Sequence, residues 1–292
     1  MSAGIQLVLD YVALTKPRIL ALVVFTALPV FSMAADGWPG TGFAVSLLLG
    51  IALAAAAANT LNCYIERDLD AVMERTRGRP LPAGKLSPSS ALGFGLVLSV
   101  VATMLLWAVG GSAAAALGVA SILFYVFVYT IWLKPRSPMN AVIGGAAGAA
   151  APLIADAAVH GTVGAAGLLL FAIVFLWQPP HVWAIALFRK DDYARAGIPM
   201  LPNVLGNRPT HWRMLWFALA LVPVTLAPAA LGLLGVPYLC AALLLDAWFV
   251  WHALRVLRDG NEEAARAMFR VSLVYLSALL LAMLLDRAID AA

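Results

Sequence analysis

Long apolar runs alternate along the chain with shorter segments that carry most of its charges. A transmembrane helix needs about 20 apolar residues, and nine runs approach that length in the 292-residue sequence. The pattern predicts an all-α, polytopic membrane protein with nine transmembrane helices. Their expected bounds are 19–35, 43–65, 90–109, 113–133, 139–158, 163–187, 213–231, 236–254 and 269–286.

Two of these runs have features that affect how their helices should pack. The fifth, MNAVIGGAAGAAAPLIADAA, consists largely of Gly and Ala. Small residues let helices approach closely, so we place this helix inside the bundle. Pro152 in this run and Pro179–Pro180 in the sixth should bend or break their helices. Broken helices at membrane depth usually line a cavity.

Basic residues fall on alternate connections of the predicted topology. Apart from Arg287, every Lys and Arg lies before the first run or in or beside the connections that follow the second, fourth, sixth and eighth runs. Cytoplasmic loops carry the excess of Lys and Arg in membrane proteins. We therefore predict a cytoplasmic N-terminus and cytoplasmic loops at about 62–88 and 188–212, within one domain that spans residues 1–292 of an inner (cytoplasmic) membrane protein.

The composition agrees with a chain whose main solvent is lipid. It is 63% hydrophobic and 12% charged, with a mean hydropathy of +0.92, whereas soluble domains are nearer half apolar. The pI of about 9.3 reflects basic cytoplasmic loops and implies no nucleic-acid partner. Cys63 and Cys240 lie far apart and indicate neither a disulfide framework nor a metal cluster. The first 20 residues lack the pattern of a cleavable secretory signal.

Polar residues at a regular spacing close the second apolar run. Asn62, Glu66 and Asp70 are separated by four residues each, and each such step rotates about 40° around a helix, so the side chains would share one face. Mg²⁺ commonly binds one or two carboxylates together with water and a substrate phosphate. The set is therefore a candidate Mg²⁺ site. The alternative is a solvated helix end whose acids pair with nearby arginines.

Arg75 and Arg79 follow in the segment RTRGRPLPAG. Guanidinium groups bind phosphate oxygens in a bidentate manner, although basic residues at a cytoplasmic interface also bind lipid headgroups. Gly78 and Pro80 indicate that a regular helix ends here. Acids beside arginines favour a diphosphate bridged to the protein by a metal ion.

A second candidate site lies in LWQPPHVWAIALFRKDDYARAGIPMLP. Asp191 and Asp192 could hold a second Mg²⁺. Lys190 and Arg195 could contact the diphosphate, and Tyr193 could hydrogen-bond it or shape the pocket.

His181 follows the proline pair inside an apolar run. A polar group within a membrane needs a partner or a task. Three tasks fit: ligating an iron, transferring a proton, and satisfying backbone carbonyls that the prolines leave free.

A diphosphate bound at a membrane surface beside apolar helices points to a prenyl diphosphate substrate. Mg²⁺, Arg and Lys would stabilise the charge that develops on the leaving diphosphate. Aromatic faces would stabilise the allylic cation, with ordinary packing as the alternative for each ring. The candidate aromatic residues are Tyr64, Trp177, Trp183 and Tyr193.

Five segments carry a resemblance to a known family. They are LTKPRI (14–19), NCYIERDLDAVMERTRGRPLPAG (62–84), YTIWLKPRSPMNAVIGGAAGAAAPLI (129–154), PPHVWAIAL (179–187) and DDYARAGIPMLP (191–202). With them the chain resembles the UbiA-type intramembrane prenyltransferases, and within these the branch that farnesylates haem. That branch has Glu in the middle of its Asn/acid series, as at Glu66. Gln178 and Ala150–Ala151 depart from its pattern and affect only the expected cavity shape.

The resemblance implies that farnesyl diphosphate, haem B and water give haem O and diphosphate, with Mg²⁺ as cofactor and nine helices around a central cavity. It suggests a haem A synthase or terminal oxidase assembly proteins as further partners. It assigns His181 to handling haem, as ligand or proton donor. The implied diphosphate–metal site comprises Asn62, Glu66, Asp70, Arg75, Arg79, Lys190, Asp191 and Asp192.

Three alternatives share some of these features. Another UbiA-type enzyme could act on an aromatic or quinone precursor. A transporter would also break helices at prolines, but its acids should lie at mid-membrane rather than at the cytoplasmic ends. A non-catalytic haem assembly factor would need His181 but not the series of acids.

Overall fold

The computed structural model describes residues 2–33 and 38–290. These ranges are helical and contain no strand, which confirms the all-α prediction. The helices are α1(Ala3–Leu14), α2(Pro17–Met33), α3(Thr41–Ile65), α4(Arg67–Val72), α5(Pro88–Leu123), the π-helical η1(Phe124–Leu133), α6(Asn140–Gly148), α7(Ala150–His160), α8(Ala165–Phe188), α9(Lys190–Arg195), α10(Leu201–Val204), α11(Asn207–Ala230), α12(Val236–Asp259) and α13(Glu262–Asp290).

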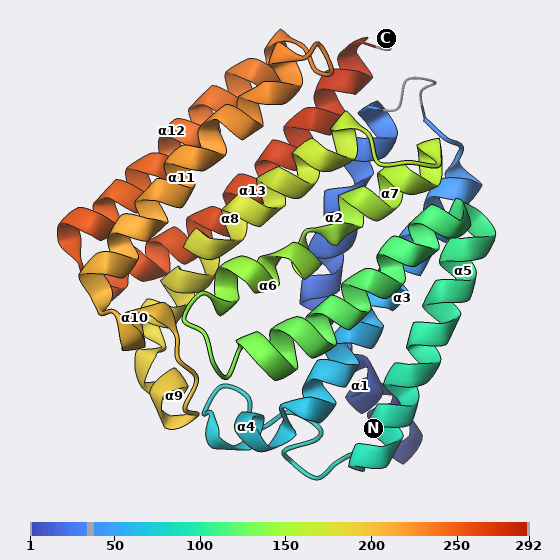
Figure 1. Cartoon of the computed structure of the whole chain (residues 1–292), viewed down its shortest axis with the longest axis vertical. Coiled ribbons are helices and arrows are strands. Elements are labelled where there is room, and N and C mark those ends of the chain that lie inside the picture. Colours follow the sequence, from blue (N-terminus) through green and yellow to red (C-terminus); the bar gives the residue numbers. More distant parts are fainter. Residues whose placement is uncertain (1, 34–37, 291–292) are drawn as a thin grey trace.

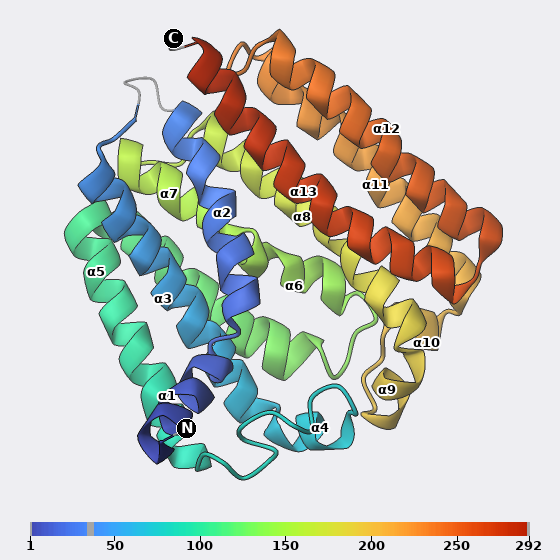
Figure 2. The same cartoon turned by 180° about the vertical axis from the view of Figure 1, so that it is seen from behind.

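The long helices form a ring that closes through α2. On one side α3 packs against α5, and on the other α8, α11, α12 and α13 pack in sequence, with α2 contacting both α3 and α13. The helices α6 and α7 lie between these groups (Figure 1). The short helices α4, α9 and α10 gather at the end where the chain begins, whereas the C-terminus lies at the opposite end (Figure 2).

The number of spans depends on how two bent segments are counted. Seven described helices are long and apolar enough to cross a membrane, and α1 with α2, bent by 51°, would make an eighth. One of the seven is the 46-residue segment Pro88–Leu133. It contains Gly111 at φ 76°, a conformation that suits glycine, and the chain turns back there (Figure 1). Its two arms match the predicted third and fourth spans. The count of nine and the side of the N-terminus stay predictions.

The prolines act differently in the two helices where we expected bends. The fifth predicted span divides at Ala149 into α6 and α7, three residues before Pro152. In this span, 50% of the residues in the apolar window are buried, the largest share among the candidate spans. Its many small residues predict this burial. In contrast, α8 continues through Pro179 and Pro180 to Phe188, so the helix does not break there, and the bend that we gave as the other outcome stays a prediction. Packing of α8 against α6, α11 and α13 holds the helix despite two missing N–H donors.

Reporter fusions would test the orientation. Because Lys and Arg are concentrated on alternate connections, we predict a cytoplasmic signal from reporters placed after Arg79 or Lys190. A reporter placed at Gly111 should give an external signal. Gly111 is a suitable insertion point because a Cβ added there would meet no atom within 4 Å. A reversed pattern would place the two acidic loops on the outer face and remove the predicted orientation.

Candidate active site

The predicted series of polar residues lies at the junction of α3 and α4, and all three members are buried. Asn62, Glu66 and Asp70 are only 2%, 5% and 4% exposed. The helix ends at Ile65, and Glu66 adopts φ −89° and ψ 7° before α4 begins. Backbone hydrogen bonds from Glu66 N to Asn62 O and from Asp70 N to Glu66 O preserve the four-residue spacing. Burial contradicts the alternative of a solvated helix end.

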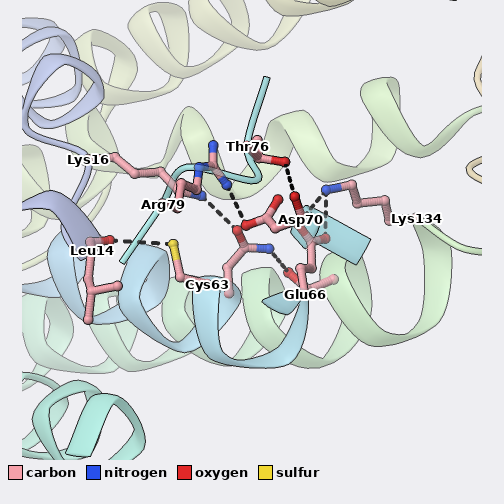
Figure 3. A network of polar contacts seen from close by, with 10 residues as sticks. Leu14, Lys16, Cys63, Glu66, Asp70, Thr76, Arg79 and Lys134 are labelled. Carbon is pink, nitrogen blue, oxygen red and sulfur yellow. Dashed lines mark hydrogen bonds and ion pairs between the residues drawn. The ribbon is translucent and has the colours of Figure 1, made fainter. Parts of the chain in front are cut away.

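Each member of the series has a cationic partner from another segment, and Figure 3 shows the three cations around the two carboxylates. Taking a carboxylate out of water is costly unless an opposite charge and hydrogen bonds compensate. The pairs are Lys16 Nζ to Asn62 Oδ1 at 2.7 Å, Lys134 Nζ to Glu66 Oε2 at 2.6 Å, and Arg79 Nη1 to Asp70 Oδ2 at 2.7 Å. Arg79 therefore pairs with an acid of the series, as the helix-end alternative also predicts, and its contact with a diphosphate stays a prediction.

Sequence reasoning missed Lys16 and Lys134. Both begin a Lys-Pro-Arg tripeptide, at 16–18 and 134–136, and this internal repeat was the available signal. Lys16 has φ 55°, a positive value that no other described non-glycine residue shares. Such an outlier is costly and is often found at functional sites. Lys16 lies in the short connection between α1 and α2, and its ammonium reaches Asn62 from there.

The second acidic segment forms α9 and packs against the first. Met73, which follows α4, shares a buried cluster with Tyr193 and Ile198. Asp192 Oδ1 accepts hydrogen bonds from the Glu74 backbone N–H and from Arg195 Nη2. Burial opposes ionisation of Asp192, but these two donors outweigh it and hold its pKa below the usual value. Asp192 is therefore a carboxylate at neutral pH.

The other candidates of this segment line a polar hollow of about 370 Å³ between α9 and the start of α11 and α13. Asp191 is exposed, and Lys190 Nζ donates to Asn207 Oδ1 at 3.3 Å. Arg195 and Asp192 contribute to the same lining. Tyr193 is 8% exposed and packs inward, so it shapes the segment rather than the hollow.

Two predicted residues lie away from these groups. Arg75 is exposed and has no ion pair within the described part of the chain. Tyr64 packs beside the cluster of Leu14 and Cys63, and the Arg67 guanidinium lies 5.1 Å from its ring centre. Neither residue lines the polar hollow or the central cavity.

A central cavity of about 660 Å³ lies between α2, α3, η1, α6, α7, α8 and α13. Its wall is mainly apolar with a few polar side chains, as in most small-molecule sites. Trp177 lines it, whereas Trp183 is fully buried against Phe217 outside it. The polar lining includes Asn59, Tyr125, Tyr129, Gln178 and His181.

Tyr129 connects the cavity with the acidic site. Its ring lines the cavity, and the Lys134 ammonium lies 5.9 Å from the ring centre. Lys134 in turn binds Glu66. A Cβ at Gly144 would come within 2.1 Å of the Tyr129 ring, so only glycine allows α6 this close to the tyrosine.

The donor atoms of this end of the molecule fit Mg²⁺. Glu66 Oε1 and Asp192 Oδ2 are buried carboxylate oxygens that accept no hydrogen bond, although Lys134 Nζ lies 2.6 Å from the former. No three His, Cys, Asp or Glu side chains converge among the described residues. Mg²⁺ keeps water and takes phosphate oxygens along with one or two carboxylates, so one or two of these oxygens would be enough to bind it.

Comparison with known proteins decides the family. The sequence model of the UbiA prenyltransferase family matches residues 23–291. The chain belongs to the UbiA prenyltransferase family. Within it, the chain is 47% identical to protoheme IX farnesyltransferase of Acidiphilium cryptum over 96% of this chain and 91% of the relative. The protein of the same name from Symbiobacterium thermophilum is 46% identical over 96% and 95%.

Solved structures show that the fold is also that of UbiA proteins. A digeranylgeranylglyceryl phosphate synthase aligns with a TM-score of 0.80 over 97% of this chain and 99% of its own, at 17% identity. A UbiA homologue from Archaeoglobus fulgidus, bound to DMAPP and Mg²⁺, aligns with a TM-score of 0.63 over 94% and 99%, at 15% identity. The chain is thus a multi-pass membrane protein with the UbiA arrangement of helices.

Proposed function

We propose that this protein transfers the farnesyl group of farnesyl diphosphate to a vinyl group of haem B, with water supplying the hydroxyl of the product, haem O. The observation that carries the proposal is identity of 45–47% over nearly the full chain with relatives named protoheme IX farnesyltransferase. A cationic, acid-rich site above an apolar cavity supplies the two environments that such a reaction needs.

The polar end of the molecule would bind the diphosphate. Lys16, Lys134 and Arg79 bring three positive charges to one place, where they can donate hydrogen bonds to phosphate oxygens. Glu66 and Asp70 would hold one Mg²⁺ and Asp192 another, with water and phosphate oxygens completing each set of ligands, and a bound Mg²⁺ neutralises charge on the leaving group. These groups are preorganised by burial, so they stabilise the developing diphosphate charge without reorganising.

The cavity would hold the farnesyl chain and the porphyrin. Its apolar wall excludes water from the allylic cation after the C–O bond breaks. The new carbon–carbon bond forms at the vinyl group, and the adjacent carbon then takes up water and releases a proton. Trp177 and Tyr129 line the cavity, and aromatic rings beside an allylic cation would stabilise it.

We place the active site on the cytoplasmic side of the inner membrane, since the basic loops accompany it. One domain over residues 1–292 would suffice, and a haem A synthase or terminal oxidase assembly proteins would receive the product.

Pigment analysis tests the function. Membranes that contain the protein should form haem O from haem B when farnesyl diphosphate is added, as measured by chromatography of extracted haems. Membranes without the protein provide the baseline. Conversion of an aromatic or quinone precursor, with haem B left unchanged, would refute the assignment.

Metal dependence is a separate prediction. We expect turnover to cease in excess chelator and to return with Mg²⁺, because buried carboxylate oxygens without a hydrogen-bond partner are hard ligands of the kind that Mg²⁺ binds. The measurement is haem O formation in chelated membranes with and without added Mg²⁺. Undiminished turnover in chelator would exclude the metal-bridged arrangement.

Alanine variants of Arg79 and Arg75 should lose different amounts of activity. Arg79→Ala removes the cation that pairs with buried Asp70, so we expect haem O formation to fall on the order of 10²-fold. Arg79→Lys should recover little if the guanidinium binds in a bidentate manner. Arg75→Ala should cost less, because Arg75 is exposed and unpaired in the described structure. Equal, small losses in both alanine variants would favour lipid-headgroup binding.

A further inference from the structure

Ser272 on α13 contacts both rings that form one wall of the central cavity. Its hydroxyl oxygen lies 2.7 Å from His181 Nδ1, and its backbone carbonyl accepts a 2.7 Å hydrogen bond from Trp177 Nε1. His181 and Trp177 lie one turn apart on α8. A single residue of α13 therefore positions two neighbouring side chains of another helix.

The proton of the Ser272 hydroxyl determines which nitrogen of His181 is protonated. Ser272 Oγ donates to the backbone carbonyl of Phe269 at 2.7 Å. A hydroxyl has one proton, so towards His181 this oxygen can only accept. With the hydroxyl proton directed to Phe269, the 2.7 Å contact assigns the imidazole proton to His181 Nδ1, which leaves Nε2 with a free lone pair. The other tautomer would direct an N–H into a mainly apolar cavity, and an unsatisfied buried donor is costly.

Aromatic neighbours hold the imidazole in this orientation. The His181 ring stacks on Trp177 at a centroid distance of 4.6 Å, and Phe269 covers it at 5.0 Å. The ring lines the central cavity. Its Nε2 makes no hydrogen bond with any residue that the structure describes. An imidazole held by these contacts, with a nitrogen that has no protein partner, therefore belongs to the lining of the space in which an acceptor substrate would lie.

We propose that Ser272 is a positioning residue that fixes the Nδ1–H tautomer of His181, so that Nε2 ligates the iron of haem B in the central cavity. The proposal rests on the proposed function. Histidine that ligates a metal donates its other N–H to an acceptor, and this fixes both the tautomer and the ring orientation. Neutral imidazole is a common ligand of haem iron. The same tautomer leaves Nε2 no proton to donate, which decides between the two haem-handling roles.

Haem B titration of the purified protein in detergent, without farnesyl diphosphate, tests the proposal. The Soret band reports affinity, and electron paramagnetic resonance of the ferric form reports the axial ligand. We expect a histidine-ligated spectrum for wild type. Ser272→Ala should weaken haem binding about 10- to 100-fold, the usual effect of removing such a partner, and should diminish the histidine signal. Ser272→Thr keeps the hydroxyl and should restore both.

Two further variants separate positioning from folding. His181→Gly should lose the histidine signal, and added imidazole should bring it back in a protein that is correctly folded. Ser99→Ala is the matched control, because the Ser99 hydroxyl also donates to a carbonyl of its own spanning helix, at 2.8 Å, but lies outside the cavity lining. We expect Ser99→Ala to bind haem as wild type does.

The outcomes distinguish this inference from the proposed function. A histidine signal that survives in His181→Gly, or wild-type spectra and affinity in Ser272→Ala, would overturn the inference. Haem O formation by wild type without histidine ligation would also overturn it and leave the function in place. Histidine ligation that depends on His181 and Ser272, without haem O formation, would support the inference and refute the function.

Discussion

Replacing Asp70 by Asn should reduce haem O formation on the order of 10²- to 10³-fold while haem B binding persists. Asn has the shape of Asp and retains one oxygen that can accept the 2.7 Å hydrogen bond from Arg79 Nη1. The Thr76 hydroxyl, which donates to the Asp70 backbone carbonyl, is unaffected. What is lost is the negative charge that would bind Mg²⁺. Product formation and Soret titration of the same preparation provide the two measurements.

Asp68→Asn is the matched control for this variant. Asp68 lies two residues away, but its side chain is 86% exposed and its ion pair with Arg67 spans 3.6 Å. Exposed pairs of this kind contribute little, so activity should stay close to that of wild type. Equal loss in both variants would indicate a general effect of charge at the membrane surface. Loss of haem binding in Asp70→Asn would favour a haem-handling role for this acid over a metal-binding one.

The parts of the site that sequence could predict are those with local signals. Four-residue spacing identified Asn62, Glu66 and Asp70. Backbone hydrogen bonds keep that spacing even though α3 ends before Glu66 and α4 begins after it. The apolar runs predicted that one span ends at 109 and the next begins at 113, and Gly111 forms the turn between them. Both features depend on residues that are close together in the sequence, so their conformation can be predicted without knowing the rest of the fold.

The partners of these residues depend on contacts between distant segments. Lys16 is 46 residues from Asn62, and Lys134 is 68 residues from Glu66. In a single sequence each lysine is only a basic residue beside a proline. The positive-inside rule already explains a basic residue at the end of a spanning helix, so nothing marks either lysine as part of a site. Ser272 resembles any serine that hydrogen-bonds to its own helix, and its contact with His181 spans 91 residues. Which helix ends meet is set by packing of the whole bundle.

The continuous α8 shows how tertiary packing overrides a local rule. A proline pair normally interrupts a helix, because two N–H donors are missing and the rings crowd the preceding turn. In this protein α8 continues across Pro179 and Pro180, and His181 lies directly after them. No helix break places His181, and contacts with Ser272, Trp177 and Phe269 hold its ring instead. The cavity beside it comes from the arrangement of surrounding helices.

Removing the charge of Lys134 should affect stability as well as activity. Lys134 and Glu66 side chains are only 18% and 6% exposed, and their charged groups are 2.6 Å apart. Lys134→Gln would leave a buried carboxylate without its counter-ion, and breaking such a pair costs about 3–5 kcal/mol. We expect a lower apparent Tm in detergent and a loss of haem O formation. Arg136→Gln is the control, because Arg136 is exposed and donates only to carbonyls of its own helix end.

The double variant Lys134→Gln, Glu66→Gln separates the two effects. It removes both charges, so no uncompensated ion stays buried and the apparent Tm should return towards that of wild type. Haem O formation should stay low, because the double variant lacks both a metal ligand and a cation for the diphosphate. Recovery of activity together with stability would mean that the pair only supports the fold. A Lys134→Gln single variant as stable as wild type would instead show that Glu66 is not held in its buried position by this ammonium.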